Sequence, residues 1–362
     1  MSKISSSKWL VMLTILCLSP IALWADFFVP AAEFSKMGVD YAKLEPVNLA
    51  YNGEYFVALE IVTDVKVKAE GVTRILRLFR FNGNKIAKVE SAKIPITHRV
   101  NAAVSDRKPE VFIVGNYGTK IVRVDLTKMQ VDVPFQFKKG EAGFKSQGFL
   151  FCANGAFYAT GEFYDNEQYW TGDAVAKLEV NKDGKIKPIL KYNTDEVFKS
   201  FKDGMVQAFY HVSGDQVFFN LIKPEERKTY LMLYKNKKIT EIDKGELLNI
   251  FVGCENSVFY TVKNQNKQQH FVKNLTTQKA WQIGTDNAEY TYPFMSDKGD
   301  ILIVITITYS LKTLDAYYGK RQENYKLKRF LRRASLGPMK MSADGRTFMI
   351  MTKDGYQYGE LK

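Results

Sequence analysis

The sequence reads Cys152-Ala-Asn-Gly-Ala-Phe-Tyr158 and, further along, Cys254-Glu-Asn-Ser-Val-Phe-Tyr260. Both stretches follow the pattern Cys-x-Asn-small-x-Phe-Tyr, and both come after an apolar run. Looser copies occur at residues 50–57, 104–112, 212–218, 295–302 and 341–349. Asn, Asp and Gly suit a tight turn, because such a turn requires a positive φ or a side chain that bonds to its own backbone. Each copy therefore predicts a short strand, a tight polar turn and a longer apolar strand.

Two further strands are expected between one copy and the next. The turns from Asn52 to Asp344 are on average about 49 residues apart, a spacing found in repeat proteins. Each interval holds a third strand with alternating apolar residues, such as Arg74–Phe81 or Ala174–Val180, and then a turn and a more polar fourth strand. Four antiparallel strands in every 40–55 residues or so are typical of a β-propeller. We therefore predict an all-β propeller with seven four-stranded blades; the alternatives are a pair of β-sandwiches, or six blades plus an irregular one.

The last copy of the repeat lacks a strand. Residues 338–362 offer three strands before the chain ends. A ring with an unpaired edge invites aggregation, so another part of the chain is expected to complete the last blade. The segment before the first copy, residues 26–46, is the available donor. We predict that it supplies the outer strand of the last blade.

One turn resembles those of a known group of propellers. Ser342-Ala-Asp-Gly-Arg-Thr-Phe-Met349 resembles the Ser-x-Asp-Gly-[Lys/Arg] turn of TolB-like and WD40-like propellers, and Ser296–Asp300 is a degenerate version of it. The sialidase Asp-box has one more residue between Asp and Gly, so it does not match. No Trp-Asp dipeptide follows the blades, so the WD40 family proper is not supported. The resemblance implies the propeller architecture and no particular function, since propellers include enzymes, receptors and scaffolds.

The first 25 residues are typical of a secretory signal. Lys3 and Lys8 precede an apolar run from Trp9 to Leu18, which is broken by Ser19-Pro20 and followed by Ala22-Leu-Trp-Ala25. The run is too short to span a bilayer comfortably. We predict cleavage after Ala25, with an uncleaved signal anchor as the alternative. The mature chain, residues 26–362, is then a single propeller domain located outside the cytoplasm, in the periplasm or secreted.

Composition limits the class of protein and its partners. The chain has 362 residues, of which 46% are hydrophobic and 25% charged, so it is neither disordered nor a polytopic membrane protein. Its net charge of +13 becomes +11 once Lys3 and Lys8 are removed with the signal. A basic protein favours anionic partners, although lysines also serve solubility. We expect a monomer without a transmembrane span after signal cleavage, and no nucleic acid as partner.

Catalytic and metal-binding motifs are absent from the sequence. His98, His211 and His270 have no metal-ligand spacing, and there is no Gly-x-Ser-x-Gly elbow and no phosphate-binding loop. Cys152 and Cys254 occupy equivalent places two blades apart, too far for a disulfide, so both are expected to be free thiols in the core. No catalytic residue, metal or cofactor is predicted. Carboxylate pairs for glycoside chemistry remain at Asp165, Glu167 and Asp173, and at Asp315 and Glu323.

Two long aromatic segments are the candidate binding site. Residues 161–173 and 309–325 are interpreted as loops between second and third strands, which would share one face of the ring with the connections between blades. Tyr and Trp give rigid contact area at recognition surfaces. The candidate binding residues are Tyr164, Tyr169, Trp170, Tyr317, Tyr318, Lys320 and Arg321.

Two functions fit these observations. The first is a non-catalytic propeller that binds a protein, peptide or glycan through the aromatic loops. The second is a propeller enzyme, a glycan hydrolase or lyase, that acts on a polymer outside the cytoplasm. They differ in what the ring should hold at its centre: two carboxylates, or a His with a Tyr or Arg, within about 5–10 Å for the enzyme, and apolar and Lys side chains for the binding protein.

Overall fold

The fold was analysed in a computed structural model of the chain. It describes residues 27–50, 53–62, 73–82, 85–96, 101–115, 119–136, 143–153, 155–164, 170–193, 199, 201, 204–206, 211–213, 216–264, 267–283, 290–296, 298–308, 311–318, 321–325 and 336–360. The predicted signal segment lies outside these residues, and so does its cleavage site.

The described strands form separate antiparallel sheets, and in all but the last the chain runs from an inner strand outward. The first blade holds β2 (Leu44–Leu49), β3 (Tyr55–Val62), β4 (Thr73–Asn82) and β5 (Lys85–Ile94). The second holds β6 (Asn101–Val104), β7 (Glu110–Gly115), β8 (Lys120–Asp125) and β9 (Gln130–Gln136). The third holds β10 (Gly143–Ala153), β11 (Ala156–Tyr164), β12 (Trp170–Val180) and β13 (Ile186–Asn193).

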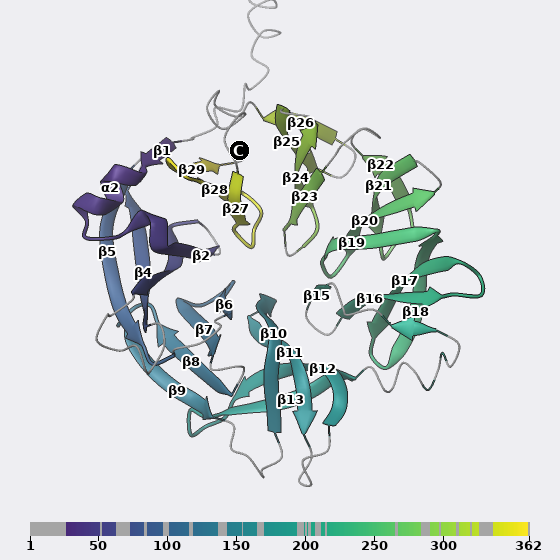
Figure 1. Ribbon diagram of the computed structural model, residues 1–362, viewed down its shortest axis with the longest axis horizontal. Coiled ribbons are helices and arrows are strands. Elements are labelled where there is room, and N and C mark those ends of the chain that lie inside the picture. The colour runs from purple at the N-terminus through teal and green to yellow at the C-terminus, as the bar shows by residue number, and fades with distance from the viewer. Residues whose placement is uncertain are drawn as a thin grey trace, which may run out of the picture.

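The remaining sheets continue around the ring (Figure 1). The fourth blade holds β14 (Met205–Val206), β15 (His211–Ser213), β16 (Gln216–Lys223), β17 (Lys228–Lys235) and β18 (Lys238–Gly245). The fifth holds β19 (Leu247–Gly253), β20 (Ser257–Asn264), β21 (Lys267–Asn274) and β22 (Ala280–Ile283). The sixth holds β23 (Tyr290–Met295), β24 (Ile301–Thr308), β25 (Leu311–Tyr318) and β26 (Arg321–Tyr325). The last holds β27 (Leu336–Met341), β28 (Thr347–Thr352), β29 (Gly355–Glu360) and β1 (Phe27–Pro30).

The predicted propeller is confirmed, but one of its sheets is not a regular four-stranded blade. In the fourth blade the inner position is divided between β14, which pairs with Leu221–Ile222 of β16, and β15, which pairs with Gln216–Phe218. Neither piece is long enough to pair along the whole of β16. The described strands therefore form six regular blades plus an irregular sheet, the alternative left open by the sequence, and the expectation of seven regular four-stranded blades is wrong.

The N-terminal segment closes the last blade as predicted. Strand β1 pairs with β29 in a register from Phe27↔Tyr358 to Pro30↔Gly355. The strand is shorter than the predicted segment, because helix α2 (Ala31–Lys36) follows at once, then the 3-10 turn η1 (Tyr41–Lys43), and Leu44 already begins the first blade. Phe34 of α2 is fully buried, with its ring 5.4 Å from that of Phe79 and 5.5 Å from that of Tyr356. The segment thus joins the last blade to the first.

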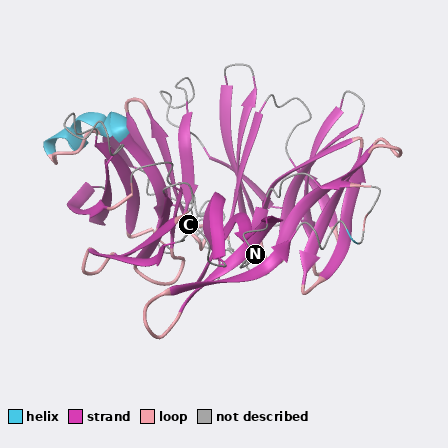
Figure 2. Cartoon of the chain, turned by 60° about the horizontal axis from the view of Figure 1, so that its bottom comes forward, coloured by secondary structure: helices cyan, strands magenta, loops and turns pink. Residues whose placement is uncertain are grey.

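Strand direction assigns every turn to one of two faces. Turns between first and second strands, and between third and fourth strands, lie on one face, which we call the tight-turn face. Turns between second and third strands lie on the other, together with the connections between blades, and we call it the connection face. Helix α2 follows the outer strand β1 and so belongs to the connection face, at the rim of the ring (Figure 2).

Glycines in the repeat turns hold neighbouring blades together. Gly53, Gly155, Gly299 and Gly345 all have φ between 72° and 75°. Each also approaches the adjacent blade closely: a Cβ on Gly345 would lie 2.7 Å from Cβ of Ser296, and one on Gly53 would lie 2.3 Å from Oγ1 of Thr347. The glycines of the repeated turns therefore have two roles: they adopt the positive φ that the turn requires, and they allow the turn to contact the neighbouring blade closely.

A matched pair of substitutions separates these two roles. Gly184 has the same conformation as Gly345 (φ +74° and +75°), but a Cβ there would meet no heavy atom within 4 Å. Gly184→Ala should therefore cost about 1–2 kcal/mol, the cost of a left-handed conformation. Gly345→Ala should cost an additional 1–3 kcal/mol or so, because Ser296 and Ile301 must also shift. Chemical unfolding measures both; equal losses would show that the approach to the next blade contributes nothing.

Candidate functional site

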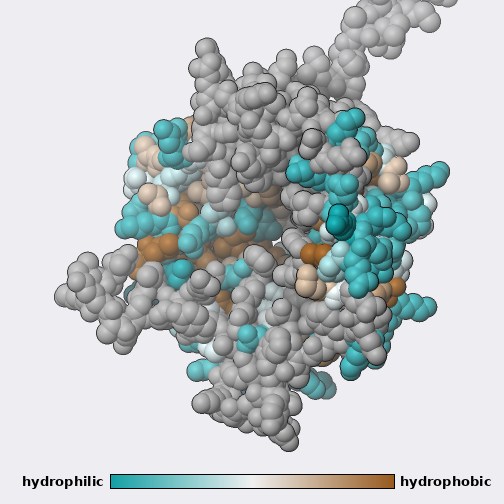
Figure 3. Space-filling model, turned by 45° about the vertical axis from the view of Figure 1, so that its right-hand side comes forward, coloured by the Kyte–Doolittle hydropathy of each residue, from teal (hydrophilic) through white to brown (hydrophobic). Residues whose placement is uncertain are grey.

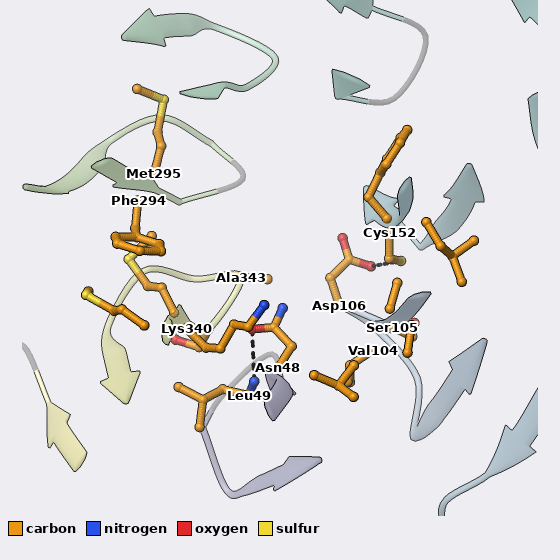
Figure 4. A pocket seen from close by; sticks show the side chains of 18 of the residues that line it. Asn48, Leu49, Val104, Ser105, Asp106, Cys152, Phe294, Met295, Lys340 and Ala343 are labelled. Atoms are coloured by element: carbon orange, nitrogen blue, oxygen red, sulfur yellow. Dashed lines mark hydrogen bonds between the residues drawn. The ribbon is translucent and has the colours of Figure 1, made fainter. Parts of the chain in front are cut away.

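A cavity of about 310 Å³ lies at the centre of the ring. It is formed by the carboxyl-terminal ends of inner strands from five blades, β2, β6, β10, β23 and β27, together with the first residues of the turns that follow. Because inner strands point their ends toward the tight-turn face, the cavity lies toward that face. Figure 4 shows its walls, and Figure 3 shows hydrophobic surface around the hollow near the middle of the molecule.

The cavity lining is mainly apolar with a few polar groups. The apolar part includes three methionines, Met295, Met339 and Met341, and small side chains of β6. The polar side chains are Asn48, Ser105, Asp106, Cys152, Lys340 and Ser342.

Asp106 joins the second blade to the third through hydrogen bonds within the protein. It is 6% exposed, and its Oδ1 accepts hydrogen bonds from the backbone N–H of Gly155 at 2.7 Å and from the thiol of Cys152 at 3.3 Å. Burial, and then the charge of Asp106, raise the pKa of the Cys152 thiol far above its usual value. Cys152 therefore stays protonated at neutral pH and is no nucleophile. Both Cys152 and Cys254 are free thiols; Cys254 is buried as predicted, whereas Cys152 is only partly buried and lines the cavity.

Lys340 is the cation of the cavity. It extends from β27 into the cavity, on a different wall from Asp106 (Figure 4). Burial lowers the pKa of its ammonium group below the usual value. Within the described part of the chain, no carboxylate lies within ion-pair distance of Lys340. The ammonium group is therefore available to an anionic group of a ligand.

The described residues do not assemble a catalytic centre. Asp106 is the one carboxylate that lines the cavity, and no three His, Cys, Asp or Glu of the described segments gather as metal ligands. His270 is buried in β21, where its Nδ1 shares a hydrogen bond of 2.8 Å with Oγ1 of Thr261. His211 lies in β15, away from the lining, and His98 is outside the described residues.

The predicted aromatic site is divided by the structure. Residues 309–325 were expected to be one loop. The described residues among them, 311–318 and 321–325, are instead the strands β25 and β26, so Tyr318 and Arg321 pair across a third-to-fourth turn on the tight-turn face. Tyr164 and Trp170 pair at the end of β11 and β12, on the connection face. The two groups therefore cannot cover one opening together. The candidates Tyr169 and Lys320 lie outside the described residues.

Tyr317 belongs to the core. It is 4% exposed and packs with Phe259, Val272 and Leu302 between the fifth and sixth blades. Its interpretation as a residue of an exposed loop is wrong, because β25 continues through it to Tyr318.

The candidate acids for glycoside chemistry do not line the cavity either, where the structure describes them. Asp315 and Glu323 lie on β25 and β26, the two outer strands of the sixth blade, and Asp173 lies on β12. Asp165 and Glu167 are outside the described residues. None of the described three lines the central cavity.

Comparison with known proteins supports the fold. A scan against protein-family models and a search of curated proteins return no match. Among solved structures, an oligogalacturonate lyase in complex with manganese aligns with a TM-score of 0.53 at 10% identity, over 94% of this chain and 91% of that one. An acylaminoacyl peptidase of Pyrococcus horikoshii aligns with a TM-score of 0.54 at 6% identity, over 85% of this chain and 49% of that one. TolB from Acinetobacter baumannii aligns at 13% identity over 91% of this chain and 70% of that one, with a TM-score of 0.40.

The chain is a β-propeller. At these identities the likeness extends to the fold alone. No helix in the described segments is long and apolar enough to span a bilayer.

Proposed function

We propose that this propeller is a non-catalytic binding protein located outside the cytoplasm, and that it takes an apolar segment of a protein or peptide into its central cavity. The observation that carries the proposal is the lining of that cavity: apolar side chains and one lysine, without a pair of catalytic carboxylates in the described residues. This is the lining expected of a binding protein rather than of a glycan-degrading enzyme.

A peptide fits the lining better than a sugar does. Methionine side chains are flexible and polarizable, so Met295, Met339 and Met341, which are packed in the wall of the cavity, allow that wall to adjust to apolar side chains of different shapes. Sugar sites instead use open aromatic planes on which rings stack. Of the two aromatic residues in the lining, Phe151 already stacks on Tyr158 with ring centroids 5.8 Å apart, so Phe294 is left as a single ring.

Lys340 gives the cavity its specificity. A mostly buried ammonium group without a described acidic partner is stabilised by a carboxylate from a ligand, because a charge-assisted hydrogen bond offsets its desolvation. The ligand is therefore an apolar segment that carries an acidic side chain or a terminal carboxylate. Tyr164, Tyr169 and Trp170 remain proposed contacts for parts of the partner that reach the connection face.

Peptides selected from a random-sequence display library against residues 26–362 would test the proposal. We expect apolar peptides with a carboxylate to be enriched. Lys340→Met should weaken their binding by about tenfold or more, the loss of a charge-assisted bond, whereas the exposed Lys353→Met should not. Calorimetry with the purified peptides measures the affinities.

Two results would count against this function. Enrichment of peptides whose affinity is the same for Lys340→Met and for Lys353→Met would place the binding site outside the cavity. Turnover of an anionic polysaccharide by the purified chain, lost on substitution of Asp106 by Asn, would support the enzyme alternative instead.

A further inference from the structure

Lysines occupy the turns between third and fourth strands in the first five blades. Each of these five turns carries at least one exposed lysine in the turn or at the strand end beside it. These residues, which we call the lysine rim, are Lys85, Lys128, Lys182, Lys185, Lys235, Lys237, Lys238 and Lys279. In the sixth blade the sequence between β25 and β26 is Gly319-Lys320, followed by Arg321.

The lysine rim lies on one face and is not neutralised there. All of its members are on the tight-turn face, because third strands end and fourth strands begin there. No ion pair joins any of them to an acid of the described residues. Two acids share these turns: Asp183, and Asp125, whose Oδ1 accepts the backbone N–H groups of Thr127 and Lys128. Eight lysines against two acids leave the rim strongly positive.

Other described turns mix both signs. The first-to-second turns nearer the ring axis hold Arg107, Lys108 and Arg346, but also Glu54 and Glu255. On the connection face, the second-to-third turn of the fourth blade carries Glu225 and Glu226, and Lys353 stands beside Asp354. The consistent positive charge is therefore a property of the outer rim. Figure 3 shows hydrophilic surface over the side of the ring that holds the fourth and fifth blades.

The chain enters the described fold on the same face. Strand β1 is the outer strand of the last blade and runs from the tight-turn face, at Phe27, to the connection face, at Pro30. The sequence before Phe27 contains the apolar run from Trp9 to Leu18 with Lys3 and Lys8 ahead of it. In the alternative of an uncleaved signal anchor, the membrane segment therefore precedes β1 on the lysine-rich face of the ring.

We propose that the tight-turn face docks on an anionic lipid bilayer through the lysine rim. Lysine is a compact point charge on a flexible stem, so it suits a diffuse anionic surface, whereas bidentate recognition of one defined anion favours arginine. A lysine near an anionic bilayer contributes about a fivefold factor to the partition coefficient. Charges spread around a ring contact a plane at several points at once, whereas an acidic polysaccharide is held better by a continuous groove.

Docking in this orientation would place the cavity near the bilayer. The meaning of that placement rests on the function proposed above. The cavity is lined by the carboxyl ends of the inner strands, toward the tight-turn face. A docked ring would hold it close to the bilayer, where segments of membrane-associated proteins are available.

Vesicle flotation tests the docking with the mature chain, residues 26–362. We expect binding to vesicles that contain phosphatidylglycerol, weak binding to pure phosphatidylcholine, and release by high salt, since exposed charges are screened. Replacement of Lys182, Lys237 and Lys238 by Glu should lower the partition coefficient on the order of 100-fold. The control replaces Lys36, Lys43 and Lys353 by Glu, the same change in net charge on exposed lysines of the connection face, and should lower it by no more than about threefold.

A second basic stretch of the sequence, Lys326, Lys328, Arg329, Arg332 and Arg333, lies outside the described residues. Three outcomes would overturn the docking: no preference for phosphatidylglycerol, equal losses in the two triple variants, or loss on charge reversal of this stretch instead of the rim. Saturable binding of a soluble anionic polysaccharide in place of vesicles would show that the rim recognises a polymer. The peptide affinities of the cavity should be unchanged in both triple variants, so failure of the docking is distinguishable from failure of the proposed function.

Discussion

A chain that begins at Met37 will not form a stable closed ring. Deleting residues 26–36 removes β1 and α2, and with them the outer strand of the last blade and the Phe34 anchor. We expect a chain that aggregates or melts far below the mature protein. The edge of β29 would be left unpaired, with backbone groups free to bond to a second molecule.

The expected size of the effect follows from how the segment is held. Phe34 is fully buried against Phe79 and Tyr356, which belong to the first and last blades, and loss of such a ring alone typically costs about 3–5 kcal/mol. The hydroxyl of Tyr41, which the deletion leaves in place, shares its hydrogen between the backbone oxygens of Thr352, at 2.8 Å, and Gly355, so the expected loss comes from β1 and α2 alone. The deletion removes the strand and the helix together and exceeds the loss for Phe34 alone.

Single substitutions serve as controls for the deletion. Phe34→Ala should lower stability by about 3–5 kcal/mol while β1 remains paired, and the exposed Lys36→Ala should change it by less than about 0.5 kcal/mol. Chemical unfolding and size-exclusion chromatography measure stability and association. A deletion variant as stable and as monodisperse as the mature chain would show that β1 does not close the ring.

The architecture was predictable because its signals are local and repeated. Four of the repeat turns place a glycine at positive φ, so Gly53, Gly155, Gly299 and Gly345 mark the repeat directly in the sequence. Alternation of apolar residues in stretches such as Arg74–Phe81 identified the third strands. The missing strand of the last copy then required a donor, and topology left the N-terminal segment.

The hairpin of the sixth blade was missed because its local signals are weak. Residues 311–318 read Leu-Lys-Thr-Leu-Asp-Ala-Tyr-Tyr, in which apolar and polar residues do not alternate strictly, and the turn after them lacks the usual Asn-Gly or Asp-Gly. The aromatic residues were therefore interpreted as a loop. Pairing with β24 and burial against the fifth blade decide the conformation instead, and both are contacts distant in sequence.

The central cavity could not be predicted as a site, since its residues come from five blades. One signal was nevertheless present in the repeat. Ser342, Ser296 and Ser105 begin equivalent turns, in which each backbone N–H donates to the first residue of the next strand. Two positions earlier the chain has Lys340, Phe294 and Ala103, respectively. The first copy, whose Ala50 N–H donates to Tyr55 O in the same way, has Asn48 at this position. A charged residue where these other copies have Asn, Phe and Ala was a sign of a specific role at the ring centre.

Replacing Tyr317 by Ala should unfold a large fraction of the protein at temperatures that the wild type survives. The ring fills the space between the fifth and sixth blades, against Phe259, Val272 and Leu302, all of them buried. Loss of a buried aromatic side chain leaves a cavity and costs about 3–5 kcal/mol. Thermal unfolding and chemical denaturation should both show the loss.

Two further variants, Tyr317→Phe and Trp170→Ala, distinguish a packing role of Tyr317 from a role in ligand binding. Tyr317→Phe keeps the ring and should recover most of the stability, whereas a recognition residue would need its hydroxyl at a ligand. Trp170→Ala, at the end of the β11–β12 ladder on the connection face, should cost about 1 kcal/mol or less if that residue is a proposed contact rather than core. If Tyr317→Ala were instead as stable as the wild type, β25 would not pack against the fifth blade. Tyr317 would then return, with Tyr318 and Arg321, to the candidates for ligand binding.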